Sequence, residues 1–481
     1  MANEPPRQSK APATRRQRDH RDRPHQKPSA KVAQKQRPAA VRAGPAGLEV
    51  RALAVRLVAA VLDRHRSLDD VLAVELAAEH AGGMAARDKG LARLIAATVL
   101  RRRGELEAAI ATFIERPLPD DRGRLSSILL VAAAQLLVLD VAPHAAINIA
   151  VEQCRHDQKA GRFAKLANAV LRRLSEGGPA LLAAQGGARA NIPFWLWARW
   201  VATYGDATAD AIASASLREA ALDITTRAGR EDWAALLGGV LLPTGTIRIA
   251  GGAHVEELAG FADGAWWVQD AAAALPALLF GEIAGQHIAD LCAAPGGKTA
   301  QLAARGAHVI AVDSSALRLA RVRQNLKRLK LEAEVIEADA TVWTPDQPLD
   351  GVLVDAPCTA TGTIRRHPDI LHLKRESDIA KLAAVQARLI EHAFAMLRPG
   401  GLLVYGTCSL EPEEGEQQIN RFLARESGAR RVPIKSAEFG GMPEWITPDG
   451  DLRTLPCHLP HDDPQRAGMD GFYAARLQRL G

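Results

Sequence analysis

Short apolar segments alternate with longer amphipathic segments from about residue 286 to the end of the chain. The short segments are typical of strands, and segments such as 317–329 are typical of helices. Repeated strand–helix units predict a doubly wound, parallel sheet of the class I, Rossmann-like α/β type, whose ligands bind at the carboxyl ends of the strands. The expected strands are 287–291, 308–313, 333–339, 349–355 and 401–407.

Each of the first four expected strands ends in an aspartate. A single aspartate at such a place would carry little weight, because Asp is common in loops and at helix starts. Four in succession at the ligand-binding edge of a parallel sheet indicate a ligand site. The four residues are Asp290, Asp313, Asp339 and Asp355.

The turn after the first strand is rich in glycine and reads Asp290-Leu-Cys-Ala-Ala-Pro-Gly-Gly-Lys-Thr299. Gly296 and Gly297 let the backbone approach a ligand closely at the N-terminus of a helix. A P-loop would need glycine where Cys292 stands, and the dinucleotide pattern G-x-G-x-x-G is absent. The turn therefore favours neither an NTPase nor a dehydrogenase.

The acidic residues after the next two strands point to a nucleoside. Asp313 ends the second strand, where a carboxylate can accept hydrogen bonds from both ribose hydroxyls, and Asp339 is placed to meet an adenine edge. A nucleoside cofactor without a pyrophosphate suits S-adenosylmethionine. The predicted cofactor-binding residues are Cys292, Ala293, Ala294, Pro295, Gly296, Gly297, Lys298, Asp313, Asp339 and Asp355.

Two cysteines follow neighbouring strands. The fourth strand runs into Asp355-Ala-Pro-Cys358, and the fifth runs into Tyr405-Gly-Thr-Cys-Ser409. Because strands four and five are neighbours in a doubly wound sheet, we expect Cys358 and Cys408 to face one crevice. One buried cysteine is usually inert core, but two at adjacent catalytic-edge positions indicate thiol chemistry.

The number and spacing of the cysteines also indicate the redox environment of the protein. Five cysteines without a C-x-x-C pair argue against a disulfide framework and against a common zinc site. Free thiols indicate a reducing, cytoplasmic setting. The longest nearly apolar run, 128–139, is interrupted by Gln135 and falls short of the ~18 residues that span a bilayer. We therefore expect neither a metal site nor a membrane-spanning segment.

Residues 1–46 differ in composition from the rest of the chain. They hold twelve Lys or Arg residues against three acidic residues, seven prolines, and no aromatic residue, Leu or Ile. Such a segment cannot bury enough apolar surface to offset its ordering entropy. We expect a disordered basic tail that holds polyanions such as RNA, and a tail that only solubilises the chain is the alternative.

Residues 47–176 are typical of an all-helical domain. The segment 128–139 is apolar on nearly every side, as a helix at the centre of a bundle would be. The order of features resembles the NusB family of RNA-binding helical bundles, with an unrelated bundle as the alternative. The residues that carry this likeness are Pro143, Ile147, Asn148, Val151, Phe163, Asn168, Val170 and Leu171.

A chain of 481 residues is long enough for about three domains. Residues 188–285 mix short strands and helices, which predicts a small α+β connector, and 286–481 form the doubly wound domain. The connector contains several tryptophans. Tryptophan can stack on nucleic acid bases, but we expect these side chains in the core.

The chain closely resembles the RsmB-type (Fmu/Sun) ribosomal RNA cytosine-C5 methyltransferases of the wider NOP2/Sun family. The shared stretches are 264–270, 292–298, 355–369, 405–409 and 470–473. Two residues depart from the usual pattern: Gly406, where Ser or Ala is usual, and Tyr473, where Phe is common.

The resemblance implies methylation of cytosine C5 in RNA, with 16S ribosomal RNA as the substrate, S-adenosylmethionine as the cofactor and a covalent adduct at C6 of the base. It assigns the nucleophile to Cys408, the release of the product to Cys358, and contacts with cytosine N3 and the exocyclic amine to Asp355. Lys298 would hold the cofactor carboxylate or the acidic cluster. A monomer is expected.

Three other interpretations stay open. The chain could be an amino-methyltransferase in which the motif at Asp355 binds the substrate base. In such enzymes the residue after the proline is usually aromatic, whereas here it is Cys358. Cys358 could be the nucleophile, as in DNA cytosine methyltransferases. The chain could also be a non-catalytic RNA-binding or ribosome-assembly protein. Arg365, Arg366 and His367 are candidate phosphate contacts, or parts of a structural loop.

Overall fold

The computed structural model describes residues 47–77, 83–184, 187–249 and 254–481. The predicted basic tail, 1–46, lies outside the described residues. In the described ranges, no helix is both long enough and apolar enough to cross a membrane.

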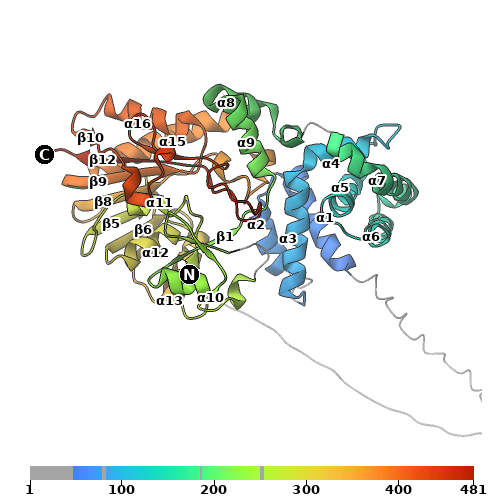
Figure 1. Ribbon diagram of the computed structural model, residues 1–481, viewed down its shortest axis with the longest axis horizontal. Coiled ribbons are helices and arrows are strands. Elements are labelled where there is room, and N and C mark those ends of the chain that lie inside the picture. The colour runs from blue at the N-terminus through green and yellow to red at the C-terminus, as the bar shows by residue number, and fades with distance from the viewer. Residues whose placement is uncertain (1–46, 78–82, 185–186, 250–253) are drawn as a thin grey trace, which may run out of the picture. The chain divides into compact units, whose positions relative to one another are not determined.

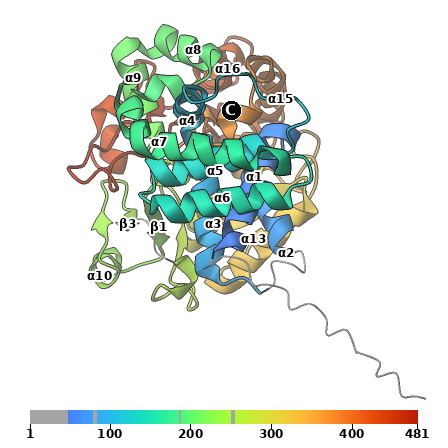
Figure 2. The same cartoon turned by 90° about the vertical axis from the view of Figure 1, so that its right-hand side faces the viewer.

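The N-terminal part of the described chain is built of helices, as predicted. The central helix α5 is buried on almost every side and packs against α1, α6 and α7 (Figure 2). Its neighbour α6 starts at Pro143, where the missing N–H costs no hydrogen bond. The helices are α1 (Leu48–Arg64), α2 (Leu68–Ala77), α3 (Ala86–Arg101), α4 (Arg103–Ala111), α5 (Leu125–Leu137), α6 (Pro143–His156) and α7 (Ala164–Ala184).

Next come two helices, followed by a small antiparallel sheet in the order β2-β3-β1-β4 with a third helix between its first two strands in the chain. The tryptophans of this part are mostly core: Trp200 and Trp266 are fully buried, which confirms the prediction. Phe194, by contrast, is 78% exposed. The elements are α8 (Phe194–Tyr204), α9 (Asp206–Ser216), β1 (Leu222–Thr226), α10 (Arg230–Leu236), β2 (Val240–Leu241), β3 (Ile247–Ile249) and β4 (Trp266–Val268).

The C-terminal part is a doubly wound sheet in the order β10-β12-β9-β8-β5-β6-β7, with β11 paired to β12 (Figure 1). The strands are β5 (His287–Leu291), β6 (His308–Asp313), β7 (Glu334–Glu337), β8 (Leu349–Asp355), β9 (Leu397–Thr407), β10 (Ala429–Arg431), β11 (Leu452–Thr454) and β12 (Phe472–Arg479). The helices are α11 (Leu275–Leu278), α12 (Gly297–Ala304), α13 (Ala316–Leu329), α14 (Ile370–Leu373), α15 (Glu376–Ala395) and α16 (Glu416–Leu423).

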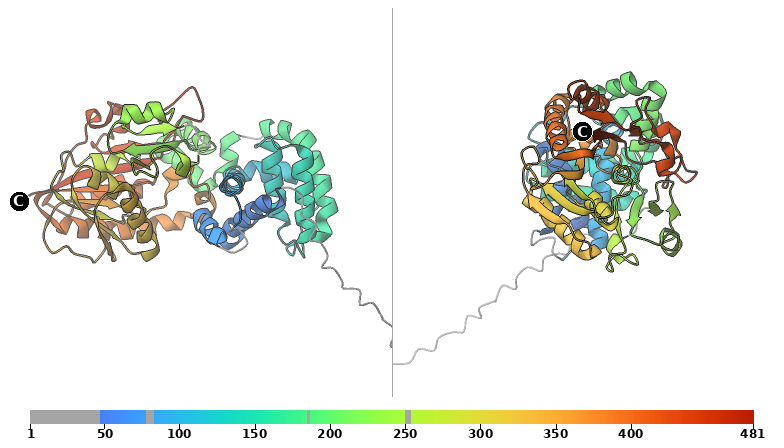
Figure 3. Two further views of the ribbon diagram at one scale, coloured as in Figure 1. Left: turned by 90° about the horizontal axis from the view of Figure 1, so that it is seen from below. Right: turned by 90° about the vertical axis from the view of Figure 1, so that its left-hand side faces the viewer.

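Strands β5 to β9 are parallel, and their order reverses at β5, with β6 and β7 on one side and β8 and β9 on the other. Ligands of such sheets bind at this point, outside the carboxyl ends of the strands. Figure 3 shows the strands of this sheet, coloured from yellow to red, from two further sides.

Helices cover both faces of the sheet because successive residues of a strand point to opposite sides. On β9, Leu403 and Tyr405 pack in one core with α15 and α16. Val404, between them, packs in a second core with α11 and Leu302 of α12. The buried strands therefore fix which residues emerge at the carboxyl edge.

The observed elements differ from the predicted ones in three places. Strand β7 ends at Glu337, so Asp339 lies in the loop beyond it. Strand β9 begins at Leu397, before the predicted start at residue 401. Leu397 pairs with Leu349 of β8, and after a shift of register the continuous pairing starts at Leu402. The antiparallel strand β12 adds to β9 and makes the sheet mixed.

Candidate active site

The aspartates at the carboxyl edge have different surroundings. The side chains of Asp290 and Asp313 are fully buried, the side chain of Asp355 is 31% exposed, and Asp339 is exposed in the loop after β7. Asp339 accepts hydrogen bonds from the backbone and hydroxyl of Thr341, which lower the pKa of its carboxyl. Asp290, Asp313 and Asp355 lie at the ends of three adjacent parallel strands, so three of the four predicted carboxylates are brought together.

The turn between β5 and α12 is folded tightly against β6. Cys292 has a positive φ of 61°, and Gly296, with φ of 98°, caps α12. A side chain at Gly296 would be strained there, and its Cβ would lie 3.1 Å from Val322. The backbone N–H of Ala294 donates to Asp313 Oδ2 at 3.3 Å, so this turn and the end of β6 share one site.

Asp290 is a buried carboxyl with an unused oxygen. Its Oδ2 accepts a hydrogen bond of 2.6 Å from Thr299, whereas Oδ1 has no hydrogen-bond partner among the described residues. Burial raises the pKa of Asp290 to about 7. A buried acceptor without a hydrogen-bond partner destabilises the folded protein, so we expect a ligand to supply a donor to this oxygen.

Asp313 keeps hydrogen-bonding capacity on the side that faces the turn. Its Oδ1 accepts a hydrogen bond of 3.0 Å from the backbone N–H of Ser315 and forms an ion pair with Arg318 Nη2 at 2.9 Å. Its Oδ2 accepts the long bond from Ala294. The Arg318 side chain is 55% exposed, so a ligand can displace it without disturbing the core.

Lys298 contacts Asp355. Its Nζ lies 2.7 Å from Asp355 Oδ2 and 5.1 Å from the centre of the Phe472 ring. The ion pair and the ring face together hold the ammonium in place between Asp355 and Phe472. Of the two partners expected for Lys298, the structure shows the acidic cluster.

Cys358 and Cys408 lie at the ends of neighbouring parallel strands, with their Sγ atoms 3.4 Å apart. The hydrogen bond with Cys358, followed by burial, raises the pKa of the Cys408 thiol well above its ordinary value. Cys408 is therefore a protonated thiol at rest, and a proton acceptor or a change in charge must accompany its use as a nucleophile.

A buried carboxylate holds the two cysteine loops together. Glu414 accepts the backbone N–H of Thr359 at 3.0 Å, the Thr359 hydroxyl, and Gln386 Nε2 at 3.0 Å. The same amide of Gln386 donates to the carbonyl of Pro357 at 2.9 Å. Residues on both sides of Cys358 are thus fixed. The sequence analysis did not propose Glu414 or Gln386 as site residues, although Glu414 belongs to the acidic stretch 411–414 after Cys408.

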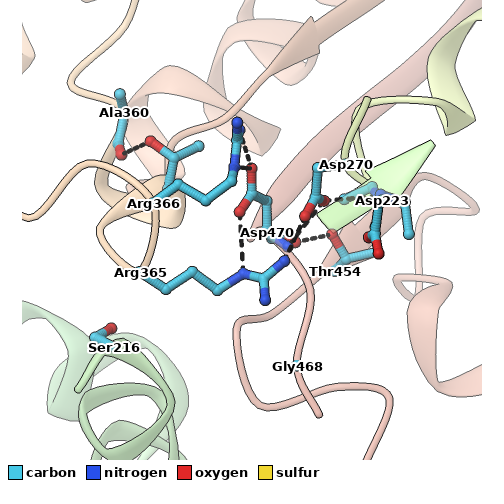
Figure 4. Close-up of polar contacts among 12 residues, drawn as sticks. Ser216, Asp223, Asp270, Ala360, Arg365, Arg366, Thr454, Gly468 and Asp470 are labelled. Carbon is cyan, nitrogen blue, oxygen red and sulfur yellow. Dashed lines mark hydrogen bonds and ion pairs between the residues drawn. The ribbon is translucent and has the colours of Figure 1, made fainter. Parts of the chain in front are cut away.

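A network of arginines and aspartates anchors the loop beyond Cys358. Figure 4 shows the Arg365 guanidinium pointing toward Asp270 and Asp470, and it forms ion pairs with both. Arg365 is 2% exposed. The prediction that Arg365 contacts phosphate is therefore wrong, because its charge is buried and used inside the protein.

Arg366 and His367 differ from Arg365 because they reach an open surface. Arg366 also pairs with Asp470, but its side chain is 35% exposed. Together with Cys408, Ala294 and Arg318, these two residues line a cavity of about 920 Å³ at the carboxyl edge of the sheet. The predicted cofactor turn and a predicted catalytic thiol thus open into one space.

Among the residues that the structure describes, no group of three or more His, Cys, Asp or Glu side chains could hold a metal ion.

Comparison with known proteins connects this site to a family. Residues 278–478 match the family model described as 16S rRNA methyltransferase RsmB/F, and residues 46–176 match the NusB family. Two similar proteins are both named Ribosomal RNA small subunit methyltransferase B. The protein from Xanthomonas campestris pv. campestris is 39% identical, over 82% of this chain and 92% of its own. The protein from Serratia proteamaculans is 35% identical, over 90% of this chain and 99% of its own.

The fold agrees with a solved structure. The crystal structure of PH0851 matches 90% of this chain and 99% of its own, with a TM-score of 0.71 and 23% sequence identity. The two sequence relatives are matched over 92% and 99% of their own lengths. The chain belongs to the RsmB/F family of 16S ribosomal RNA methyltransferases and joins a NusB-family helical domain to its methyltransferase domain.

Proposed function

We propose that the chain methylates C5 of cytosine in RNA, with 16S ribosomal RNA as the substrate and S-adenosylmethionine as the methyl donor. The observation that carries the proposal is the pair of thiols 3.4 Å apart beside the Lys298–Asp355 ion pair. Methylation of an amino group or a hydroxyl needs no thiol at all. Two thiols suit a reaction that makes and then breaks a covalent bond to the substrate.

The residues at the ends of β5 and β6 fit the cofactor. The free Oδ1 of Asp290 suits the ammonium of the methionine moiety, and Asp313 Oδ2 suits a ribose hydroxyl. Gly296 has a positive φ that favours glycine, and a Cβ there would lie 3.1 Å from Val322, so the turn carries no side chain at this position next to the proposed cofactor. When bound, S-adenosylmethionine supplies an electrophilic methyl group.

Cytosine C5 is a poor nucleophile, so the base must first be activated. In the proposed reaction the Cys408 sulfur bonds to C6, and the ring becomes enamine-like, so that C5 takes the methyl group. The thiol proton of Cys408 leaves through the hydrogen bond to Cys358 and passes on to water, so that Cys358 is deprotonated when the C5 proton must be taken up. Asp355, held by Lys298, would bind N3 and the exocyclic amine and stabilise the charge that develops on the ring.

Release of the product requires loss of the C5 proton and breaking of the bond between C6 and the Cys408 sulfur. The C5 proton passes to a base, for which we propose Cys358. The C6–S bond then breaks, and the Cys408 sulfur returns as a thiolate. Glu414 and Gln386 hold Cys358 next to Cys408, as this step requires.

Release of tritium from RNA labelled at cytosine C5 tests the proposal. The chain should release tritium in step with methyl transfer to 16S ribosomal RNA, because C5 loses its hydrogen in the reaction. Methyl transfer with tritium retained would favour an amino-methyltransferase, and no transfer at all would favour an RNA-binding or assembly protein. Cys154→Ala, a buried position in α6, is the control that should leave tritium release unchanged.

A further inference from the structure

A second cavity, of about 730 Å³, adjoins the cavity that Cys408 lines. The two cavities share Arg366 and His367 as wall residues. One face of α3, from Arg87 at its start to Arg101 at its end, forms another wall. Helix geometry puts these two residues about 20 Å apart along the axis. The second cavity is within the usual size range for ligand sites.

The wall of the second cavity is basic. It contains five arginines and three carboxylates. Three of the arginines already have partners: Arg93 pairs with Asp69, and Arg365 and Arg366 both pair with Asp470. Arg87 and Arg101 form no ion pair among the described residues. Two of the carboxylates also have arginine partners. Asp223 pairs with Arg248, and Asp270 pairs with Arg365. The third, Glu219, is exposed and makes no ion pair among the described residues. The arginines are Arg87, Arg93, Arg101, Arg365 and Arg366.

Arg101 stands out among them because it is buried and no described carboxylate lies within ion-pair distance of it. Glu219, in the same wall, acts on it only from farther away, through its charge. Arg101 is 5% exposed, yet it forms no ion pair with any described carboxylate. Its Nη2 donates to the carbonyl of Arg365 at 3.0 Å, and its Nε has no hydrogen-bond partner among the described residues. Burial lowers the pKa of Arg101 to about 10, which still leaves the guanidinium charged at neutral pH.

A buried charge without a partner is strongly unfavourable, so the position calls for an anion. We propose that the second cavity holds the RNA backbone next to the target cytosine, with Arg101 bound to a phosphate. Phosphate, like carboxylate, is an anion whose oxygens match the parallel N–H groups of a guanidinium. This inference rests on the proposed function, since RNA is the polyanion whose base must reach Cys408.

The residues shared by the two cavities indicate how an RNA strand would lie across them. A base in the first cavity and a phosphate in the second would be separated by Arg366 and His367, which line both. The Arg365 carbonyl that Arg101 contacts is in the same loop. A phosphate bound to Arg101 would therefore lie next to the loop that follows Cys358.

The test measures binding of a labelled, unstructured oligoribonucleotide at several salt concentrations with S-adenosylhomocysteine present, so that no turnover is needed. Arg101→Gln should weaken binding several-fold, equally for different sequences, and lower the slope of log affinity against log salt by about 0.7, which corresponds to one lost phosphate contact on a single strand. Arg103→Gln is the matched control. It begins α4, pairs with Glu107 and does not line the cavity, so its slope should equal that of the wild type.

An unchanged slope in a folded Arg101→Gln variant would overturn the inference. If that variant does not fold, Arg87→Gln decides the question, because Arg87 is exposed on the rim and has no ion pair among the described residues. Binding of inorganic phosphate that depends on Arg101, together with an RNA affinity that Arg101→Gln leaves unchanged, would point to a site for a lone anion and would also overturn the inference. A wild-type chain that binds no RNA would contradict the proposed function itself.

Discussion

The Sγ atoms of Cys358 and Cys408 lie 3.4 Å apart, although 50 residues of chain separate them. The parallel pairing of β8 with β9 brings the two loops to one edge, with Asp355 opposite Gly406. Hydrogen bonds then fix the loops locally: the N–H of Gly362 donates to the carbonyl of Cys408 at 2.9 Å, and Glu414 holds Thr359. The distance between the sulfurs therefore depends on residues that carry no reacting atom.

Glu414→Gln should separate the two sulfurs. An amide has one acceptor oxygen, so it cannot accept all three donors that converge on the Glu414 carboxylate. We expect Cys358 to lose its place, covalent adduct to accumulate and turnover to fall at least tenfold, with a stability loss of about 1–3 kcal/mol. Single-turnover kinetics and urea unfolding measure the two effects. Glu413→Gln is the control, because the Glu413 side chain is 31% exposed. If the Glu414→Gln variant releases its product as fast as the wild type does, Glu414 does not position Cys358.

Asp313→Ala should weaken binding of S-adenosylhomocysteine by roughly 1–3 kcal/mol, because a buried ribose hydroxyl would lose its acceptor. Isothermal titration calorimetry measures the change directly. Glu337→Ala, an exposed position at the end of β7, should bind as the wild type does. Equal affinities for both variants would remove Asp313 from the ribose site.

Asp290 predicts a dependence of stability on pH. Its pKa is about 7 in the folded protein and about 4 in an unfolded chain. The folded state therefore binds the proton more tightly, and the free energy of unfolding should fall as the pH rises from about 4 to about 7, by up to about 4 kcal/mol from this group. Asp290→Asn should lack this part of the fall in urea unfolding at pH 5 and pH 8. Parallel curves for the two proteins would exclude a raised pKa.

The same group predicts how the cofactor site responds to pH. If the ionised carboxylate binds the ammonium of S-adenosylhomocysteine, affinity should rise about tenfold from pH 6 to pH 8, following ionisation around a pKa of about 7. Asp290→Asn should bind weakly and show a flat profile in calorimetry. An affinity that does not change with pH in the wild type would separate Asp290 from the cofactor.

The alternation of strands and helices predicted the edge at which the site forms. Parallel strands must end on the same side, so Asp290, Asp313 and Asp355 could be placed together before any coordinates. Cys358 and Cys408 could be paired for the same reason. Asp339 was placed less well because the end of an edge strand depends on its neighbour, and β7 pairs only with β6.

Interactions between distant segments could not be predicted in this way. Arg365 is 95 residues from Asp270 and 105 residues from Asp470, and nothing local shows that these charges are buried together. The same holds for Arg101, whose unpaired state depends on how α3 packs against the loop after Cys358. The domain borders at 47–176, 188–285 and 286–481 and the roles of the site residues stay predictions.

The most direct measurement is a denaturing gel of labelled RNA after incubation with S-adenosylmethionine and each of two variants. Cys408→Ala removes the proposed nucleophile, so it should give neither product nor a retarded band. Cys358→Ala still permits attack and methyl transfer but not release, so it should give a retarded protein–RNA band. A retarded band for Cys408→Ala and none for Cys358→Ala would contradict the assignment and make Cys358 the nucleophile.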